Sequence, residues 1–335
     1  MHDVARRAGV SVTSVSHVIN NTRPVSDDLR QRVLAAMEEL GYQPNQLARS
    51  LRRGQTHTLG IIIPDNVNPF FAEVARGIED FSFQNGYSLI LCNSDSDLQK
   101  ELHYAGVLVE KQVDGIVFVA AGHSMEQVVG LQRRQVPVVV VDRELSGVAA
   151  DTVLADNQRG GWLATRHLLD LGHRRIGCIT GPSDLTPSAD RVAGYRQALA
   201  EAGLPVAEEL VVRGDFHYDS GYRAAQQLLA LPDPPTALFA CNDLMAVGAI
   251  CAAADLGRSV PADLSVVGFD NVSLASYTNP PLTTVAQPMY EIGALAARLL
   301  TERIQGMQAP PRRYVLNTRL VVRRSTAAPP APAPR

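Results

Sequence analysis

Alternation of apolar runs with amphipathic segments is the feature that most constrains the fold of this 335-residue chain. Nine apolar runs rich in β-branched residues lie at 59–65, 88–94, 115–121, 137–142, 175–181, 210–216, 237–243, 264–270 and 283–288. Stretches with helical spacing lie between them, clearest at 71–86, 157–172 and 289–304. Buried strands that alternate with helices are typical of parallel sheets covered on both faces. We therefore predict an α/β core of about ten strands, enough for two doubly wound subdomains.

The first 54 residues follow a different pattern, in which short helices are separated by tight turns. Residues 3–8 predict one helix, and Gly9 suits the left-handed position that follows a helix end. Ser11 is a good N-cap for a second helix, and Ser26, followed by two acids, caps a third. The second helix carries small hydrogen-bonding side chains. Such a surface offers little to a core but allows close approach to another molecule.

Charge is distributed unevenly along the chain. Residues 1–54 hold eight arginines and five acidic residues, whereas the remainder holds 23 basic and 29 acidic residues. The formal net charge of −3 therefore combines a basic head of +3 with an acidic body of −6. A basic head on an acidic body indicates that the head binds a polyanion.

Several functional classes lack their signatures in this sequence. No apolar run approaches the length of a transmembrane helix and no signal peptide opens the chain, which predicts a cytoplasmic protein without membrane contact. The four cysteines have neither metal-ligand nor redox spacing. The glycine-rich phosphate-binding motifs and the common hydrolase motifs do not occur. We therefore expect no cofactor, no metal site and no enzymatic activity.

Polar side chains follow the predicted strands where those strands end. In doubly wound sheets, ligands bind beyond the carboxyl ends of the strands. Carboxylates accept hydrogen bonds from hydroxyl groups, while arginine and asparagine donate them, and aromatic rings cover the C–H faces of a sugar. Taken singly, Phe70 and Phe71 also fit a core, Asp142 and Arg143 a local ion pair, and Asp270 a helix N-cap. Together they favour a small polyhydroxylated ligand held between two subdomains.

From Asp3 to about Ser325 the chain resembles the lactose-repressor (LacI/GalR) family of transcription factors. The motifs that carry the resemblance are 3-DVARRAGVS, 15-VSHVIN, 33-VLAAMEELGYQPN, 47-LARSLR, 68-NPFFAEVARGIED, 112-QVDGI, 171-LGHRRIG, 242-NDLMAVGA, 266-VVGFDN and 280-PPLTTVAQP. Within the family, the sequence is most similar to ribose-operon repressors and next to purine repressors. The resemblance implies a helix-turn-helix head joined to a periplasmic-binding-protein-like core of two Rossmann-like subdomains.

The resemblance also implies how DNA is contacted. Residues 12–19 resemble the recognition helix that enters the major groove, with His17 where many members carry arginine. The short helix over 45–53 resembles the hinge helix, whose leucine is wedged into the minor groove of a pseudo-palindromic operator. The implied DNA contacts are Val12, Thr13, His17, Asn20, Arg23, Asn45, Leu51 and Arg52.

For the effector, the resemblance implies a sugar. The positions that match ribose contacts in relatives are Asn68, Phe70, Phe71, Asp142, Arg143, Arg191, Phe216, Asn242, Asp270 and Gln287. Leu185 and Pro187 stand where the purine repressor has an arginine and a threonine that help to bind the base. We therefore expect ribose or a related sugar rather than a purine.

The expected organisation is a DNA-binding domain (1–44), a hinge and linker (45–57), an effector-binding and dimerisation core (58–325) and a disordered tail (326–335). The expected function is a homodimeric, ligand-responsive repressor of a ribose-utilisation operon. A purine- or nucleoside-responsive repressor is the main alternative. A sugar-binding module without DNA function is a further one. The third alternative function is a sugar-processing enzyme that uses Asp142 and Asp270 as an acid/base pair.

Overall fold

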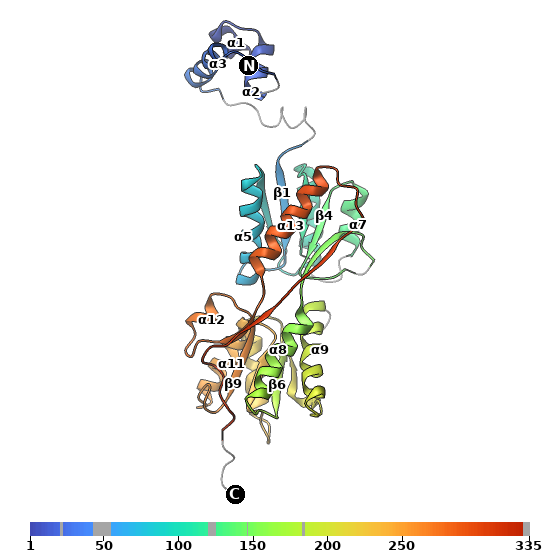
Figure 1. The fold of residues 1–335 in the computed structure, drawn as a ribbon, viewed down its shortest axis with the longest axis vertical. Helices are drawn as coiled ribbons and strands as arrows, with labels where there is room; N and C mark the ends of the chain where they lie inside the picture. The colour runs from blue at the N-terminus through green and yellow to red at the C-terminus, as the bar shows by residue number, and fades with distance from the viewer. Residues whose placement is uncertain (21–22, 43–54, 120–124, 146, 183–184, 331–335) are drawn as a thin grey trace. The chain divides into compact units, whose positions relative to one another are not determined.

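The computed structural model describes residues 1–20, 23–42, 55–119, 125–145, 147–182 and 185–330. Its contacts divide the chain into two units, Met1–Thr56 and His57–Arg335 (Figure 1). None of the helices in these described ranges combines the length and the apolar character needed to cross a membrane.

The described part of the first unit is a small helical domain. Its helices are α1 (His2–Ala8), α2 (Val12–Asn20) and α3 (Asp27–Glu39). Gly9 follows α1 with φ of 65°, a left-handed conformation that glycine adopts without steric cost. The Ser11 and Ser26 hydroxyl groups accept hydrogen bonds from the backbone N–H groups of the first turns of α2 and α3, at 3.0 and 3.3 Å. The predicted caps and helices of this head are therefore confirmed, while the predicted helix over 45–53 lies outside the described residues.

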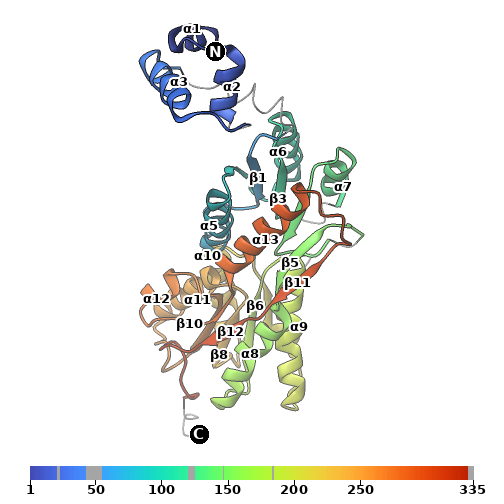
Figure 2. The ribbon, with the colours of Figure 1, turned by 45° about the horizontal axis from the view of Figure 1, so that its top comes forward.

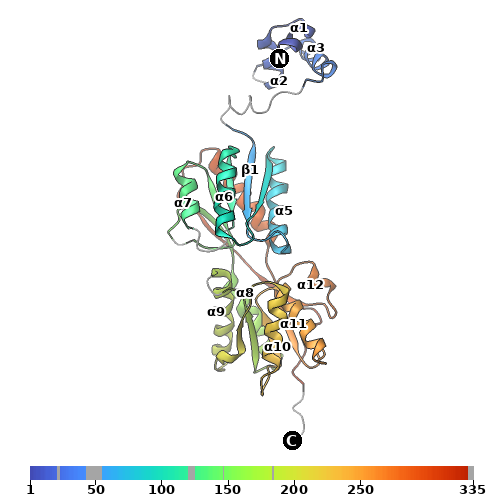
Figure 3. The same ribbon diagram turned by 180° about the vertical axis from the view of Figure 1, so that it is seen from behind.

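The second unit contains two subdomains, and the first is built on a six-stranded sheet. Its strand order is β11-β5-β4-β3-β1-β2, and its neighbouring strands pair in parallel. The strands are β1 (Thr58–Ile63), β2 (Ser88–Asn93), β3 (Gly115–Phe118), β4 (Val138–Val141), β5 (Asp151–Ala155) and β11 (Arg313–Leu316). The helices are α5 (Pro69–Gln84), α6 (Leu98–Glu110), α7 (Met125–Arg133) and α13 (Met289–Ile304). Helices α5 and α13 pack together (Figure 1), and α6 and α7 lie on the opposite side (Figure 3).

The second subdomain repeats this plan. Its sheet has the order β12-β10-β9-β8-β6-β7, parallel except that β12 runs antiparallel to β10. The strands are β6 (Ile176–Thr180), β7 (Val211–Arg213), β8 (Ala237–Ala240), β9 (Ser265–Asp270), β10 (Thr283–Ala286) and β12 (Arg319–Val321). The helices are α8 (Asn157–Asp170), α9 (Thr186–Glu201), α10 (Tyr218–Leu229), α11 (Asp243–Asp255) and α12 (Leu274–Tyr277), with a 3-10 turn at Glu208–Leu210. Helices α8 and α9 form one packed pair and α10 and α11 another.

The chain crosses between the two subdomains three times, from β5 to α8, from β10 to α13 and from β11 to β12 (Figure 2). Each subdomain is therefore assembled from segments that are distant in sequence. The carboxyl ends of the parallel strands of both sheets meet in the space between them.

The predicted α/β fold with two parallel-sheet subdomains is confirmed, but strands β5, β11 and β12 had no apolar run to mark them. β11 lies at the edge of its sheet, and most of its side chains are exposed. β5 begins with an aspartate, Asp151, whose carboxylate is fully buried between Arg303 and Arg312. A charged residue in a buried strand requires distant partners.

The start of the predicted disordered tail is also corrected. Thr326 Oγ1 lies 2.9 Å from His167 Nε2, and the carbonyl oxygen of Ala327 lies 2.9 Å from His173 Nε2. The amide of Ala327 also donates to Ser265 Oγ at 3.0 Å. These contacts fix residues 326 and 327 to the second subdomain. A proline- and alanine-rich composition gave no sign of them, because the partners lie on other helices and strands.

Candidate functional site

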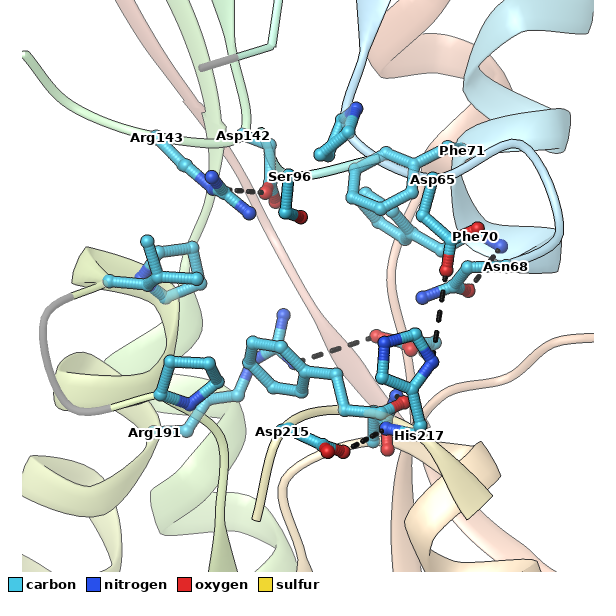
Figure 4. A pocket seen from close by; sticks show the side chains of 17 residues that line it. Asp65, Asn68, Phe70, Phe71, Ser96, Asp142, Arg143, Arg191, Asp215 and His217 are labelled. Carbon is cyan, nitrogen blue, oxygen red and sulfur yellow. Dashed lines mark hydrogen bonds and ion pairs between the residues drawn. The ribbon is translucent and has the colours of Figure 1, made fainter. Parts of the chain in front are cut away.

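A cavity of about 80 Å³ lies between the two subdomains, at the carboxyl ends of their strands (Figure 4). Nine of the ten residues predicted to bind an effector line it. From the first subdomain these are Asn68, Phe70, Phe71, Asp142 and Arg143, and from the second they are Arg191, Phe216, Asn242 and Asp270. Residues separated by some 200 positions in sequence are thus brought to one site by the strand-end rule for doubly wound sheets.

Two asparagines on opposite walls cap the helices that follow the strands. Asn68 Oδ1 accepts a hydrogen bond from the amide of Phe70 at the start of α5, at 3.0 Å. Asn242 Oδ1 accepts one from the amide of Met245 in α11, at 2.9 Å, and its Nδ2 donates to the carbonyl oxygen of Phe216. These bonds fix both side chains. The Nδ2 of Asn68 faces the cavity as a donor (Figure 4).

Strained backbone marks the ends of three strands at the cavity. Asp142 follows β4 with φ of 68°, Phe216 lies beyond β7 with φ of 73°, and Asp270 ends β9 with φ of 112°. Positive φ in residues other than glycine costs on the order of 1–3 kcal/mol each and occurs most often at functional sites. The N-cap explanation for Asp270 is excluded, because Ser273 is the residue that precedes α12.

Phe70 and Phe71 belong to the core of the first subdomain and also line the cavity. Their rings meet edge to face, with centroids 5.0 Å apart. The core explanation for this pair is therefore confirmed, and their predicted contact with a ligand stays a prediction. The ring edges and faces that reach the cavity supply an apolar surface opposite the polar walls.

Arg191 is held rigidly in the wall. Its Nε donates to Asn157 Oδ1 at 2.8 Å, its Nη1 donates to the carbonyl oxygen of Cys241 at 2.5 Å, and the same Nη1 lies 3.6 Å from Asp270 Oδ1. The guanidinium carbon also lies 3.9 Å from the centre of the Phe269 ring, a cation–π contact. A buried arginine fixed in this way presents its remaining N–H groups at a defined position.

Two buried carboxylates face this cavity with perturbed acidity. Burial raises the pKa of Asp142, opposed by the positive charges of Arg143 and Arg191. Burial also raises the pKa of Asp270 to about 7, against the charge of Arg191 and the hydrogen bond from Gln287. A desolvated carboxylate gains free energy when a ligand donates a hydrogen bond to it. Both groups are therefore suited to bind hydroxyl or N–H groups.

The predicted contact of Gln287 with the effector stays a prediction, and the structure places its side chain against Asp270. Gln287 does not line this cavity; its Nε2 donates to Asp270 Oδ1 at 2.7 Å, and its backbone amide donates to the carbonyl oxygen of Asp270 at 3.2 Å. The parallel pairing of β9 with β10 places Gln287 next to Asp270 in the sheet and not between Asp270 and the cavity. Gln287 thus positions a cavity residue.

The cavity also contains residues that the prediction did not assign. Asp65 and His217 face each other from the two subdomains, with His217 Nδ1 4.0 Å from Asp65 Oδ2 (Figure 4). Ser96 and Asp215 complete the polar lining, while Leu185 and Pro187 form an apolar wall. Asp65 and Asp215 follow β1 and β7 as polar strand-end residues, but the resemblance to ribose contacts did not select them. His217 and Ser96 carried no comparable signal.

The head presents the predicted DNA-contacting residues on α2. Val15 and Val18 face the small core, whereas Thr13 is exposed and Val12, His17 and Asn20 are half-buried. Arg23 is exposed beyond the end of α2. The Nδ2 of Asn20 donates to the carbonyl oxygen of Ser16 at 2.9 Å, within the helix. Asn45, Leu51 and Arg52 lie outside the described residues.

Comparisons with known proteins agree with this architecture. A family model described as bacterial regulatory proteins, lacI family, matches residues 1–45, and a model described as periplasmic binding protein-like domain matches residues 165–326. The HTH-type transcriptional repressor PurR of Photobacterium profundum is 41% identical over 324 residues, which cover 96% of this chain and 97% of that protein.

Two solved structures are also similar. The lac repressor dimer bound to operator and the anti-inducer ONPF has a TM-score of 0.88 at 29% identity, covering 97% of this chain and 98% of that one. A LacI family transcriptional regulator from Enterococcus faecium with bound ribose has a TM-score of 0.74 at 34% identity, covering 81% of this chain and 99% of that one. With its helical head, its two parallel-sheet subdomains and these matches along almost its whole length, the chain belongs to the lacI family of ligand-responsive, DNA-binding transcriptional repressors.

Proposed function

We propose that this repressor is a cytoplasmic homodimer that binds a pseudo-palindromic operator and is regulated by D-ribose, or a closely related sugar, in the cavity between its subdomains. The observation that carries the effector assignment is the pairing of two buried carboxylates, Asp142 and Asp270, on opposite walls. Each accepts hydrogen bonds, and Asn68, Arg143 and Arg191 add donors. A pentose offers several hydroxyl groups that both donate and accept.

The size and charge of the cavity support a small, uncharged ligand. About 80 Å³ holds on the order of six ordered waters, which suits a ligand the size of a single sugar ring or nucleobase. The lining carboxylates Asp65, Asp142, Asp215 and Asp270 outnumber the guanidinium groups of Arg143 and Arg191. This balance disfavours a phosphate group and supports the unphosphorylated sugar.

A purine effector is the second candidate, and the similarity to PurR favours it. Phe71, Arg191, Phe216 and Asp270 could serve a base as well as a sugar. Against it, the wall formed by Leu185 and Pro187 has no side-chain donor or acceptor for the polar edge of a base. The relative with bound ribose supports the sugar.

Calorimetry on the full chain tests the two candidates directly. We expect D-ribose to bind, ribose 5-phosphate to bind more weakly, and hypoxanthine and guanine not to bind. Gel-shift titration of an operator, with and without ribose, then tests regulation, and we expect ribose to weaken operator binding. Tight hypoxanthine binding with no response to either sugar would overturn the ribose assignment and leave the repressor function intact.

The three crossings between the subdomains support a route from the cavity to DNA. A ligand that touches both walls favours one angle between the subdomains, and a typical coupling free energy between two sites is about 1–3 kcal/mol. The operator side of the proposal rests on α2, whose exposed Thr13 is available to base edges in the major groove.

The homodimer rests on exposed apolar side chains along one edge of the first subdomain. Phe83 on α5, Leu91 on the edge strand β2, and Leu98 and Leu102 on α6 are 45–77% exposed. Large exposed apolar side chains gathered on neighbouring elements are typical of protein interfaces. We expect Leu102→Glu to shift the protein toward monomer in sedimentation at micromolar concentration. Leu256→Glu, an exposed leucine beyond α11, is the control and should leave the dimer unchanged.

A further inference from the structure

We propose that the second subdomain holds a further ligand site, for a small anion with an apolar body, in a hollow between α9 and strand β7. The hollow has a volume of about 450 Å³. The described residues that carry the argument are Thr180, Ser188, Val192, Arg196, Val211 and Arg213. None of the described residues that line it also lines the cavity between the subdomains, so the site goes beyond the proposed function.

The sequence builds this hollow from one helical stripe and one strand face. Ser188, Val192 and Arg196 follow each other at intervals of four along α9 and therefore share a side of the helix. Val211 and Arg213 alternate along β7 and share a face of the sheet, with Arg213 in register with Thr180 of β6. Because β7 is the last strand of its sheet, the hollow is open at that edge.

An unsatisfied hydroxyl group indicates that the hollow accepts a ligand. Ser188 is 1% exposed, and its Oγ is buried without a hydrogen-bond partner among the described residues. A buried polar atom without a partner costs free energy, and most such atoms in native proteins have a partner. A bound anion that accepts a hydrogen bond from this hydroxyl group would remove the cost.

The charge of Arg196 favours an anion as the ligand. None of the described residues that line the hollow is acidic. Arg196 Nη2 donates to Glu208 Oε2 at 2.9 Å, which engages one of the five N–H groups of the guanidinium. Glu208 is largely exposed, so water screens its repulsion of an incoming anion. Planar guanidinium groups bind carboxylate and phosphate oxygens in pairs.

The other side chains that line the hollow indicate that the ligand also has an apolar group. Val192 on α9 and Val211 on β7 are half-buried, and both line the hollow. A fully hydrated ion would leave these side chains without contact, whereas an aromatic or aliphatic group would bury them. Phosphate monoesters and carboxylates that carry such a group share the required chemistry.

Calorimetry on the full chain tests the site with four probes. Phenyl phosphate and benzoate each combine an anionic group with an apolar ring. Inorganic phosphate has only the anionic group, and phenol has only the ring. We expect at least one of the first two to bind with a dissociation constant of about 1 mM or tighter, and the single-feature probes to bind at least about tenfold more weakly. The stronger of the two identifies the phosphate or the carboxylate as the preferred anion. Absence of binding by both at about ten times that concentration would overturn the proposal.

Two variants locate the bound probe. Arg196→Gln and Ser188→Ala should each weaken binding, Arg196→Gln by about tenfold or more, because a charge-assisted hydrogen bond is lost. Arg166→Gln is the matched control, since Arg166 is an equally exposed arginine on α8 with one acidic partner, Asp170. Thermal unfolding of each variant checks the fold. If Asp270→Ala removed phenyl phosphate binding and Arg196→Gln did not, the probe would lie in the other cavity and the proposal would be wrong.

Discussion

The guanidinium group of Arg191 lies 3.6 Å from the carboxylate of Asp270, and the two side chains are only 4% and 6% exposed. Arg191 comes from α9 and Asp270 from the end of β9, so the pair joins a helix and a strand at the floor of the cavity. Gln287 holds the same carboxylate oxygen from behind. This buried pair is the best fixed part of the candidate effector site.

Asp270→Asn should weaken effector binding. A carboxylate that accepts a hydrogen bond from a ligand hydroxyl group contributes about 1.5–3 kcal/mol, and an amide replaces one acceptor oxygen with a donor. Calorimetry with D-ribose measures the loss. Asn271→Ser, at the neighbouring half-buried position, serves as the control, because Asn271 does not line this cavity.

Effector affinity should depend on pH in the wild type. The pKa of Asp270 is about 7 because burial raises it, so the group is ionised above pH 7 and gains a proton below it. The ionised form accepts hydrogen bonds from a sugar best, and affinity should therefore fall as the pH is lowered through about 7. The Asp270→Asn variant should show a flatter dependence. An affinity that rose on acidification would contradict the proposed role of the carboxylate.

Thr13→Ala should reduce specific operator affinity. Thr13 is exposed in the first turn of α2, and a good base contact contributes about 1–3 kcal/mol of discrimination. Gel shifts on operator DNA and on random-sequence DNA measure specific and non-specific binding separately. Random-sequence binding and its salt dependence should not change, since no phosphate-binding charge is lost. Gln31→Ala, an exposed change on α3, is the control.

Asp151→Asn should destabilise the first subdomain by about 3–5 kcal/mol, because it removes the carboxylate that pairs with Arg303 and leaves Arg312 with Glu302 alone. Asp151 accepts hydrogen bonds from Arg303 and Arg312 at 2.7–3.0 Å. Denaturant unfolding at neutral pH measures the change. Asp233→Asn breaks an exposed pair with Arg175 and should cost about 1 kcal/mol or less.

The lowered pKa of Asp151 predicts that the free energy of unfolding decreases at acidic pH. Burial alone would raise the pKa of Asp151, but the hydrogen bonds from Arg303 and Arg312 lower it to about 2. The stabilisation is therefore complete above the unfolded value of 3.8 and is lost as the pH falls toward 2. Asp151→Asn should remove this component of acid unfolding. An unchanged acid transition would contradict it.

His173→Gln should reduce the loss of stability below pH 6.5. Burial lowers the pKa of His173, and of the nearby His167, from 6.5. The folded state therefore takes up protons at these rings less readily than the unfolded chain does, so stability falls as the pH drops below 6.5. Thermal unfolding between about pH 8 and pH 5 measures this slope. His103→Gln, at an exposed position on α6, should leave it unchanged.

Local sequence determined the kinds of elements and many of their ends. Ser11 and Ser26 cap helices because a short side-chain oxygen reaches the free N–H groups of the next turn, a property of neighbouring residues only. Buried strands were marked by their apolar runs, and polar residues at strand ends predicted a ligand site between two sheets. Nine of the ten effector residues that the family resemblance implied line one cavity.

Tertiary structure decided what depends on distant partners. Gln287 stands beside Asp270 because β10 pairs with β9 in one register, and no local pattern encodes that register. Asp151 lies in a buried strand only because Arg303 and Arg312, some 150 residues later, neutralise it. The acidity of Asp270 likewise depends on burial that several separate segments create together. Sequence patterns act over a few residues, whereas desolvation and pairing of charges act wherever the fold brings groups together, so only the folded chain fixes them.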